Sequence, residues 1–190
     1  MKLQYNSPVV LSFSLASLIA LILGYVTGGA STTLLFAVYR SSLTDPLTYV
    51  RLFLHVLGHS GYTHFMGNML MILVLGPSLE ERYGSRNLII GIVVTAVITG
   101  LFQMIFFKSA LLGASGVVFM MIVLSSFSGI KKGYIPLTLI LVFLLYIGDE
   151  VIDLVSTSDN VSQTAHILGG VWGLIWGWKL NKMPRRRKSK

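Results

Sequence analysis

Residues 87–107 read NLIIGIVVTAVITGLFQMIFF and residues 8–26 read PVVLSFSLASLIALILGYV, and neither stretch contains a charged side chain. Each is close to the ~20 residues with which an α-helix crosses the ~30 Å hydrocarbon core of a bilayer. Of the 190 residues in the chain, 54% are hydrophobic and only 12% are charged. Soluble domains carry roughly 25% charged residues, and disordered chains are poorer in apolar residues. The composition therefore predicts a membrane protein.

Four further stretches also lack charged residues, namely residues 61–79, 109–130, 133–148 and 161–178. The stretch at 133–148 is short, and we expect its helix to continue past Asp149. Inside lipid, the backbone N–H and C=O groups of a segment must pair within that segment, so each stretch must be helical. The sequence predicts an all-α membrane protein in which residues 1–190 form a single domain of six transmembrane helices.

Residues 27–60, between the first two predicted spans, differ from the other connections. They combine short apolar runs with Arg40, Asp45 and Arg51, and they are too long to be a simple turn between helices. Amphipathic segments of this kind tend to lie in the plane of the membrane interface. We therefore expect an ordered first loop that contains short interfacial helices.

The net charge of +8 is concentrated at residues 179–190, which contain Lys179, Lys182, Arg185, Arg186, Arg187, Lys188 and Lys190. Basic residues beside an apolar segment typically face the cytoplasm and anionic headgroups, so we expect a lipid-facing tail and no nucleic-acid site. With both termini cytoplasmic, only Arg40, Arg51 and Lys108 of the basic residues lie outside. We therefore predict a multi-pass protein of the plasma membrane. No Ala-x-Ala cleavage pattern follows the first span, which we expect to be retained.

Polar residues fall near the outer ends of three predicted spans. In this orientation the second, fourth and sixth spans run inward, and their first turns hold His64 and Asn68, then Ser115, then His166. Polar groups within a membrane are costly unless they are paired or functional. The helix after Ser115 is too short to cross the whole hydrocarbon core, which would place this serine below the outer surface. Residues 109–113 would then form a re-entrant loop.

Ser115 has both a structural and a functional interpretation. A lone serine in a membrane helix usually bonds to a carbonyl one turn back. In this chain, however, the small neighbours Gly113 and Gly116 leave the Ser115 hydroxyl accessible. At the start of a helix, unpaired backbone N–H groups also point toward any developing anion. The two interpretations remain open from these residues alone.

The histidines have the same two interpretations. A lone histidine in a span is more often a structural hydrogen-bonding residue. His166, however, is followed by Gly169 and Gly173, whose spacing permits a close approach of helices such as a Ser–His hydrogen bond requires. His64 and Asn68 lie one turn apart, so they share a helix face and can both donate hydrogen bonds to an oxyanion.

A metal site is the less favoured interpretation of the histidines. His55, His59 and His64 are close in sequence, but no H-E-x-x-H pattern exists and the chain has no cysteine. We expect no metal and no cofactor, and we interpret His59 as a loop hydrogen-bonding residue. Carboxylates after the fifth span could supply a third catalytic member, although a solvated loop is the simpler interpretation; they are Asp149, Glu150, Asp153 and Asp159.

Taken together, the motifs resemble those of the rhomboid intramembrane serine proteases. The family's G-x-S-G resembles Gly113-Ala114-Ser115-Gly116, and its H-x-x-x-N resembles His64 and Asn68. Two further motifs, A-H-x-x-G-x-x-x-G and E-x-R-x-G, are similar to Ala165, His166, Gly169 and Gly173, and to Glu80, Arg82 and Gly84. The resemblance extends from Arg51 to Gly173. One departure is that the family's Trp-Arg pair reads Val50-Arg51 here.

The resemblance implies a Ser–His dyad, in which Ser115 is the nucleophile and His166 the general base. It further implies an oxyanion hole made by His64, Asn68 and the Ser115 N–H. The residues expected to pack against the dyad are Phe119, Gly113, Gly116, Gly169 and Gly173. The implied substrates are transmembrane segments of other membrane proteins, cut near the outer membrane face, and the oligomeric state is left open.

Two other classes of function were weighed against a protease. A catalytically silent relative would bind or escort membrane proteins, but such relatives typically lose the serine or the histidine, and both are present here. A small-molecule transporter would place facing ionisable groups and broken helices near the membrane midplane. The polar groups of this chain gather toward one face only, which disfavours a transporter.

Overall fold

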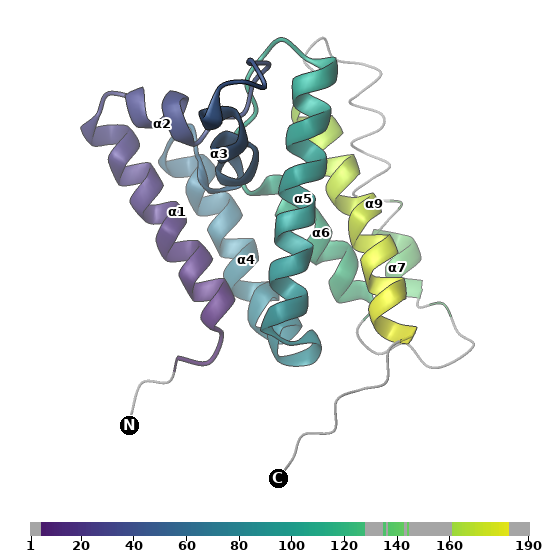
Figure 1. Ribbon diagram of the computed structural model, residues 1–190. Coiled ribbons are helices and arrows are strands. Elements are labelled where there is room, and N and C mark those ends of the chain that lie inside the picture. Colours follow the sequence, from purple (N-terminus) through teal and green to yellow (C-terminus); the bar gives the residue numbers. More distant parts are fainter. Residues whose placement is uncertain (1–4, 128–134, 136, 143, 145–160, 183–190) are drawn as a thin grey trace.

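The computed structural model describes residues 5–127, 135, 137–142, 144 and 161–182, and the regular elements in these ranges are helical, as predicted (Figure 1). In chain order they are α1 (Pro8–Val26), α2 (Ala30–Leu35), α3 (Pro46–Leu54), the 3₁₀ turn η1 (His55–Leu57), α4 (Tyr62–Tyr83), α5 (Ser85–Phe106), α6 (Ser115–Ser126), α7 (Leu137–Val142) and α9 (Val161–Lys182).

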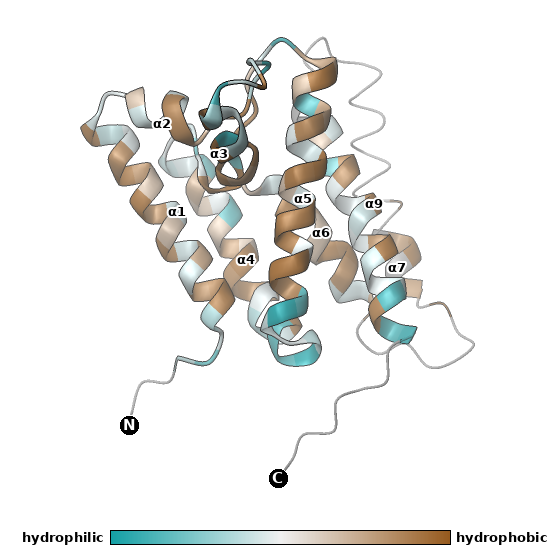
Figure 2. Cartoon of the chain, viewed as in Figure 1, coloured by the Kyte–Doolittle hydropathy of each residue, from teal (hydrophilic) through white to brown (hydrophobic). Residues whose placement is uncertain are grey.

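Two of the described helices, α1 and α5, are long and apolar enough to cross a membrane. Hydropathy colouring shows long apolar stretches along them, with hydrophilic residues toward the ends of the bundle (Figure 2). The start of α1 and the end of α9 lie at the same end of the bundle (Figure 1). This arrangement is the one that an even number of membrane crossings requires.

The start of α1 is capped by a side chain from another helix. Pro8 occupies the first turn, where a missing N–H costs nothing. The Glu80 carboxylate near the end of α4 accepts hydrogen bonds from the N–H groups of Val9 at 3.0 Å and Val10 at 3.1 Å. A carboxylate at this position satisfies free N–H groups and complements the helix dipole. Glu80 therefore fastens α1 to α4.

Two helices extend further than the charge-free stretches from which they were predicted. The helix α4 continues beyond Leu79 to Tyr83, and α9 continues beyond Trp178 to Lys182. A charged residue ends a hydrophobic stretch but does not end a helix. The backbone breaks instead at Gly84, whose φ of 83° is accessible mainly to glycine, and this residue joins α4 to α5.

The serine-bearing helix α6 begins at Ser115, well after the start of the apolar stretch at 109. The chain before it is held from three sides. Leu111 exchanges two backbone hydrogen bonds with Val38, of 2.8 and 2.9 Å, the Gly113 N–H donates to the His55 carbonyl at 2.9 Å, and the Gln103 amide donates to the Ser109 carbonyl at 2.7 Å. These contacts satisfy part of the non-helical backbone before Ser115, whose residues Leu111, Gly113 and Ala114 are buried.

The first loop is ordered and contains α2, α3 and η1. Its centre is Arg51, which is 3% exposed. The Arg51 guanidinium pairs with the Asp45 carboxylate at 2.6 Å, donates to the Tyr39 hydroxyl at 2.9 Å, and lies 4.7 Å from the Tyr39 ring centroid. Nearer the start of the loop, Arg40 donates a hydrogen bond to the Met104 carbonyl at the end of α5. These contacts anchor the loop, although Val50 stands where the Trp-Arg pair of the resembled family has its tryptophan.

The helix α6 forms the centre of the bundle. Its residues Val117, Met120 and Val123 have no exposed surface, and Met121 and Leu124 are 1% exposed. Other helices surround α6 on all sides, so apolar side chains are required around its whole circumference. The residue at the head of this buried helix is Ser115.

Candidate active site

Ser115 and His64 approach each other at Gly113. Gly113 has a φ of 131° and is held by the hydrogen bond to His55. A Cβ atom built on Gly113 would lie 2.8 Å from Cε1 and 2.9 Å from Nε2 of His64, and 3.9 Å from the Ser115 hydroxyl oxygen. Both the backbone conformation and the lack of space therefore require glycine here. The α4 histidine and the α6 serine consequently lie on the same side of this residue.

The neighbouring Ser60 orients the ring of His64. The Ser60 N–H lies 3.5 Å and the Ser60 hydroxyl 3.1 Å from His64 Nδ1. Because a backbone N–H can only donate, Nδ1 is the accepting nitrogen, and the neutral ring carries its hydrogen on Nε2. Nε2 is also one of the ring atoms nearest to Gly113. The His64 ring therefore presents a hydrogen-bond donor toward Ser115.

Asn68 lies one turn after His64 on α4 and is 7% exposed. Its amide nitrogen donates to the His64 carbonyl at 3.2 Å, so the two residues share one face of the helix, as their spacing predicted. This bond uses one of the two amide hydrogens, which leaves the second available to another acceptor.

His166 lies in the second turn of α9, one turn later than the first turn expected from the sequence. Its ring stacks on the Phe119 ring with centroids 4.3 Å apart and an interplanar angle of 6°. Phe119 follows Ser115 by one turn of α6. The His166 ring is thus fixed beside the first turns of α6.

Glycines allow α6 and α9 to pack backbone against backbone. A Cβ atom on Gly169 would lie 2.1 Å from the Gly116 carbonyl oxygen, and one on Gly173 would lie 2.6 Å from the Met120 carbonyl oxygen. A Cβ atom on Gly116 would lie 3.2 Å from the carbonyl oxygen of Ala165, the residue before His166. The residue after Ser115 therefore contacts the residue before His166. Close approach here is what the small-residue spacing predicted.

The other two histidines have structural partners and do not converge on one point. His55 Nδ1 lies 3.1 Å from the Leu52 carbonyl, and His55 Nε2 lies 3.2 Å from the Thr99 hydroxyl. Burial lowers the pKa of His55 to about 4, so the ring is neutral at physiological pH. His59 Nδ1 bonds to the Leu57 carbonyl at 3.1 Å, which confirms its expected role in the loop. In the part of the chain that the structure describes, no group of three potential ligands could hold a metal ion.

Some of the other residues considered in the sequence analysis fall outside the part of the chain that the structure describes. The carboxylates Asp149, Glu150, Asp153 and Asp159, and the tail beyond Lys182, lie outside the described residues. Two contributors were not found from the sequence: Ser60, which orients His64, and His55, whose carbonyl holds Gly113. His55 acts through a tertiary contact, whereas Ser60 contacts a residue four positions later but belongs to no recognised motif.

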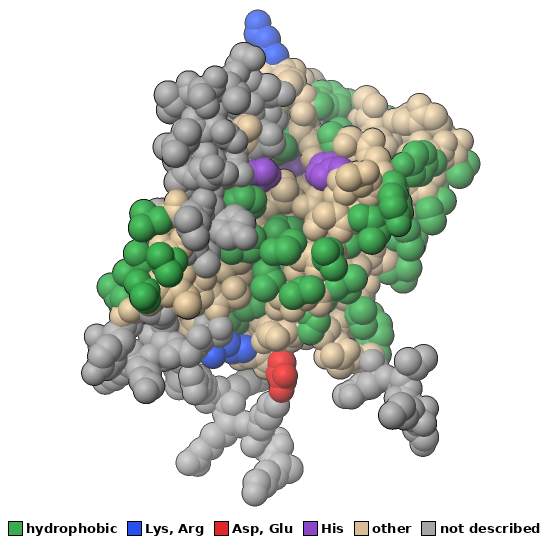
Figure 3. Space-filling view, turned by 180° about the vertical axis from the view of Figure 1, so that it is seen from behind, with side chains coloured by type: hydrophobic (Ala, Val, Ile, Leu, Met, Phe, Trp, Pro, Cys, Tyr) green, Lys and Arg blue, Asp and Glu red, His purple; other side chains and the backbone are tan. Residues whose placement is uncertain are grey.

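The surface beside the site is largely apolar. In Figure 3, histidine side chains reach the surface above a broad apolar region, while charged side chains lie toward the two ends of the molecule. Exposed apolar residues on α4 include Met66, Leu70 and Val74. A soluble protein rarely exposes an apolar region of this extent, whereas a membrane protein presents such a surface to lipid.

Comparison with known families agrees with the fold. Residues 46–183 match the model of the Rhomboid domain, which covers most of the chain. The protein is therefore a member of the rhomboid family, whose members are multi-pass membrane proteins and generally intramembrane serine proteases. The matched range contains Ser115, His166, His64 and Asn68.

Proposed function

We propose that this chain is an active rhomboid protease, a serine endopeptidase that cleaves transmembrane segments of other membrane proteins near the outer face of the membrane. The observation that carries the proposal is the position of His166, stacked on Phe119 one turn below Ser115, together with the His64 ring at Gly113, close to the Ser115 hydroxyl. These contacts support the assignment of a nucleophile on α6, a base on α9 and an oxyanion donor on α4.

In the proposed reaction the Ser115 hydroxyl attacks the scissile carbonyl. His166 accepts the proton from that hydroxyl and then transfers it to the leaving amine, which departs as the acyl-enzyme forms. Water then attacks the acyl group, with His166 again acting as base, and the carboxylic acid is released with Ser115 regenerated. His166 acts in this scheme as the base of a two-residue dyad.

The negative charge on the carbonyl oxygen needs donors that are already in place. We assign this role to His64 Nε2–H, to the second amide hydrogen of Asn68 and to the N–H of Ser115. The Ser60 contact supports the assignment for His64, because it fixes the hydrogen on Nε2. The free N–H groups at the start of α6 support the assignment for Ser115.

The same proposal includes the membrane arrangement. We infer six crossings, with the first loop at the outer interface, both termini in the cytoplasm and the protein in the plasma membrane. The positive charge of the tail sequence, and the position of the start of α1 and the end of α9 at one end of the bundle, support this orientation. Transmembrane substrates follow from the site's depth, and since a helix conceals its carbonyls, the substrate must become extended before attack.

The proposal is tested by reconstituting the protein with a transmembrane reporter and comparing wild type with Ser115→Ala and His166→Ala. We expect cleavage by wild type, and no cleavage by either variant with thermal unfolding unchanged. Mass spectrometry of the fragments would locate the cut near the outer face. Cleavage that persists in Ser115→Ala would contradict the mechanism, and binding of the reporter by wild type without any proteolysis would favour a silent relative.

A further inference from the structure

The helices α1 and α4 pack side by side (Figure 1), and each supplies the side chain that caps the start of the other. At one end of the pair, the Glu80 carboxylate of α4 accepts hydrogen bonds from the first turn of α1. At the other end, the Tyr25 hydroxyl in the last turn of α1 accepts a hydrogen bond of 3.1 Å from the N–H of Tyr62, where α4 begins. Tyr25 thus fastens α4 at the end that carries His64 and Asn68.

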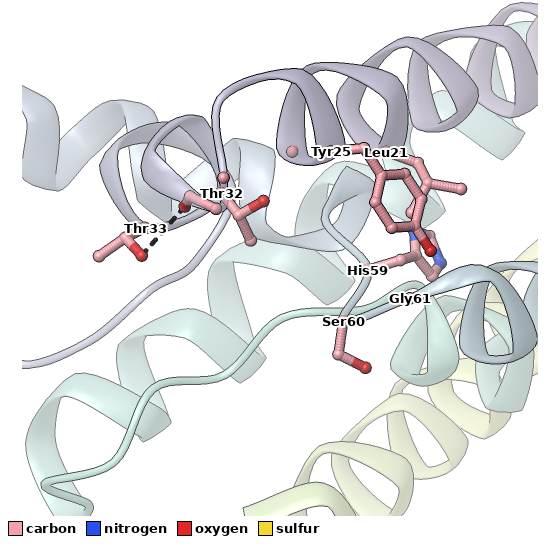
Figure 4. Close-up of a pocket in the computed structure, with 10 residues that line it drawn as sticks. Leu21, Tyr25, Thr32, Thr33, His59, Ser60 and Gly61 are labelled. Carbon is pink, nitrogen blue, oxygen red and sulfur yellow. Dashed lines mark hydrogen bonds between the residues drawn. The ribbon is translucent and has the colours of Figure 1, made fainter.

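The start of α4 takes its cap from another helix because its own N-cap residue provides none. Gly61 occupies that position and has no side chain to accept a hydrogen bond, unlike the serine, threonine, aspartate or asparagine that is usual there. In Figure 4 the Tyr25 ring extends from α1 toward Gly61, and a Cβ atom built on Gly61 would lie 3.8 Å from the Tyr25 hydroxyl oxygen. The first N–H groups of a helix have no partner within it, so the phenol oxygen takes the place of an N-cap side chain.

Packing around this hydrogen bond is incomplete. A pocket of about 350 Å³ lies between the end of α1, α2 and the chain that leads into α4, and His59, Ser60 and Gly61 line it together with Tyr25. Among the described residues, the Tyr25–Tyr62 bond is the only hydrogen bond between the last turn of α1 and the first turn of α4. Without the Tyr25 hydroxyl, the first turn of α4 is therefore freer to shift.

His64 lies in this first turn and moves with it. Ser60 fixes the His64 ring relative to the chain around it, whereas Tyr25 fixes that chain relative to α1. The position of the ring at Gly113 depends on both contacts. The His59 ring, whose centroid lies 5.1 Å from that of His64 in an edge-on arrangement, adds a third contact that is less directional than a hydrogen bond.

We propose that Tyr25 is a positioning residue for the oxyanion-stabilising side of the site: by capping α4, its hydroxyl holds His64 where Nε2–H can donate to the oxyanion. This role rests on the proposed protease function. Tyr25 acts through the start of α4 and takes no direct part in the chemistry. Because the oxyanion forms only after the attack on the carbonyl, loss of the cap should slow the chemical step and leave substrate binding unchanged.

The test compares Tyr25→Phe with Tyr49→Phe in proteoliposomes that contain the transmembrane reporter. Tyr49 is the matched control, because it is also exposed and its hydroxyl donates to the Leu43 carbonyl within the first loop at 3.0 Å. We expect kcat of Tyr25→Phe to fall about fivefold, within the range that the loss of one hydrogen bond produces, with KM and Tm as in the control. Equal kcat values in the two variants, beside an active wild type, would overturn the role of Tyr25, whereas an inactive wild type would contradict the proposed function itself.

Two double variants test whether the lost cap is the cause. The backbone at Gly61 is extended, with a φ of 170°, and a Cβ atom there has room, so a serine at this position can supply the capping oxygen from within the chain. Tyr25→Phe with Gly61→Ser should recover most of the wild-type kcat, whereas Tyr25→Phe with Gly61→Ala should not. Equal kcat values in these two double variants would overturn the proposal.

Hydrogen exchange at the start of α4 checks the cap without any catalytic assay. The peptide that contains the Tyr62 amide should exchange faster in Tyr25→Phe than in wild type, and slowly again when Gly61→Ser is added. Exchange that is unchanged in Tyr25→Phe would show that the hydroxyl does not cap the helix, and faster exchange with an unchanged kcat would show that the cap does not position His64.

Discussion

At the residue scale, the tautomer of His64 is set by Ser60. The Ser60 hydroxyl and N–H both face Nδ1, so that the other nitrogen carries the hydrogen. Without the hydroxyl, only the longer contact from the backbone N–H remains, and the ring is free to turn away from Gly113. A serine outside the recognised motifs thus supports a proposed catalytic group.

We therefore expect Ser60→Ala to lower kcat for reporter cleavage by about tenfold, with KM unchanged. The reduction is smaller than the about 10²–10³-fold effect of removing an oxyanion donor outright, because His64 itself is retained. The exposed Ser42 in the first loop provides the matched control, Ser42→Ala, which should keep wild-type rates. Steady-state kinetics in proteoliposomes measure both, and an equal kcat for the two variants would remove the assigned role of Ser60.

At the element scale, the contact between α6 and α9 depends on glycines. The atoms closest to a Cβ atom on Gly169 belong to the backbone of Gly116, which cannot move away as a flexible side chain could. Because His166 and Ser115 lie beside this contact, its geometry determines how the two proposed catalytic groups approach each other.

Gly169→Ala should lower the free energy of unfolding by about 1–3 kcal/mol, as overpacking in a close-packed interior does, and should reduce cleavage. Gly67→Ala is the matched control, because a Cβ atom on Gly67 meets nothing within 4 Å and alanine favours the helix. Thermal unfolding in detergent compares the two. A similar loss of stability in both variants would contradict the role assigned to the α6–α9 contact, because alanine by itself favours the helix.

The helices could largely be predicted from the sequence, but their ends could not. Charge-free runs identified α1 and α5 closely, because lipid demands the same pattern from any crossing helix. The end of α4 at Gly84 and the start of α6 at Ser115 depend instead on backbone conformation and on contacts with the first loop. Hydropathy does not report these contacts.

At the scale of the whole molecule, the first loop fastens the bundle near the site. The Val38–Leu111 pairing and the Arg40 contact with α5 join the loop to the segment before Ser115. Arg51 and Asp45 in turn hold the loop together. The stability of this loop should therefore affect the stability of the site, although neither Asp45 nor Arg51 belongs to the site.

The pH dependence of stability tests the Asp45–Arg51 pair. The N–H of Leu47 lowers the pKa of Asp45 most strongly, burial opposes this effect, and Arg51 lowers the pKa further, so that it lies below its ordinary value of 3.8. A lowered pKa in the folded state means that ionised Asp45 favours folding above the ordinary pKa, and that this contribution is lost as the pH falls through the folded pKa. In the variant Asp45→Asn, the asparagine side chain can still cap the start of α3, but it carries no charge.

Asp45→Asn should consequently have a lower Tm than wild type near neutral pH, and the difference should shrink as the pH falls below about 4. Differential scanning fluorimetry over a series of buffers measures the difference. A Tm difference that stays constant or grows in acid would contradict the contribution of the charge.

The candidate site could be predicted in its residue types but not in its supports. The motifs around Ser115, His64, Asn68 and His166 were recognisable because their chemistry restricts both residue type and spacing. The pocket at His59 and the supports of Gly113 and His64 arise where the first loop packs on the bundle. The His55–Gly113 contact joins residues far apart in the chain, and the Ser60–His64 contact, although local, belongs to no recognised motif.

The central claim is that Ser115 is a nucleophile activated by His166, and covalent labelling tests it most directly. A fluorophosphonate probe should modify wild type in proteoliposomes, and peptide mass spectrometry should locate the adduct on Ser115. Labelling should disappear in Ser115→Ala and fall to background in His166→Ala, with both variants folded. An adduct on another residue, or full labelling of folded His166→Ala, would contradict the account.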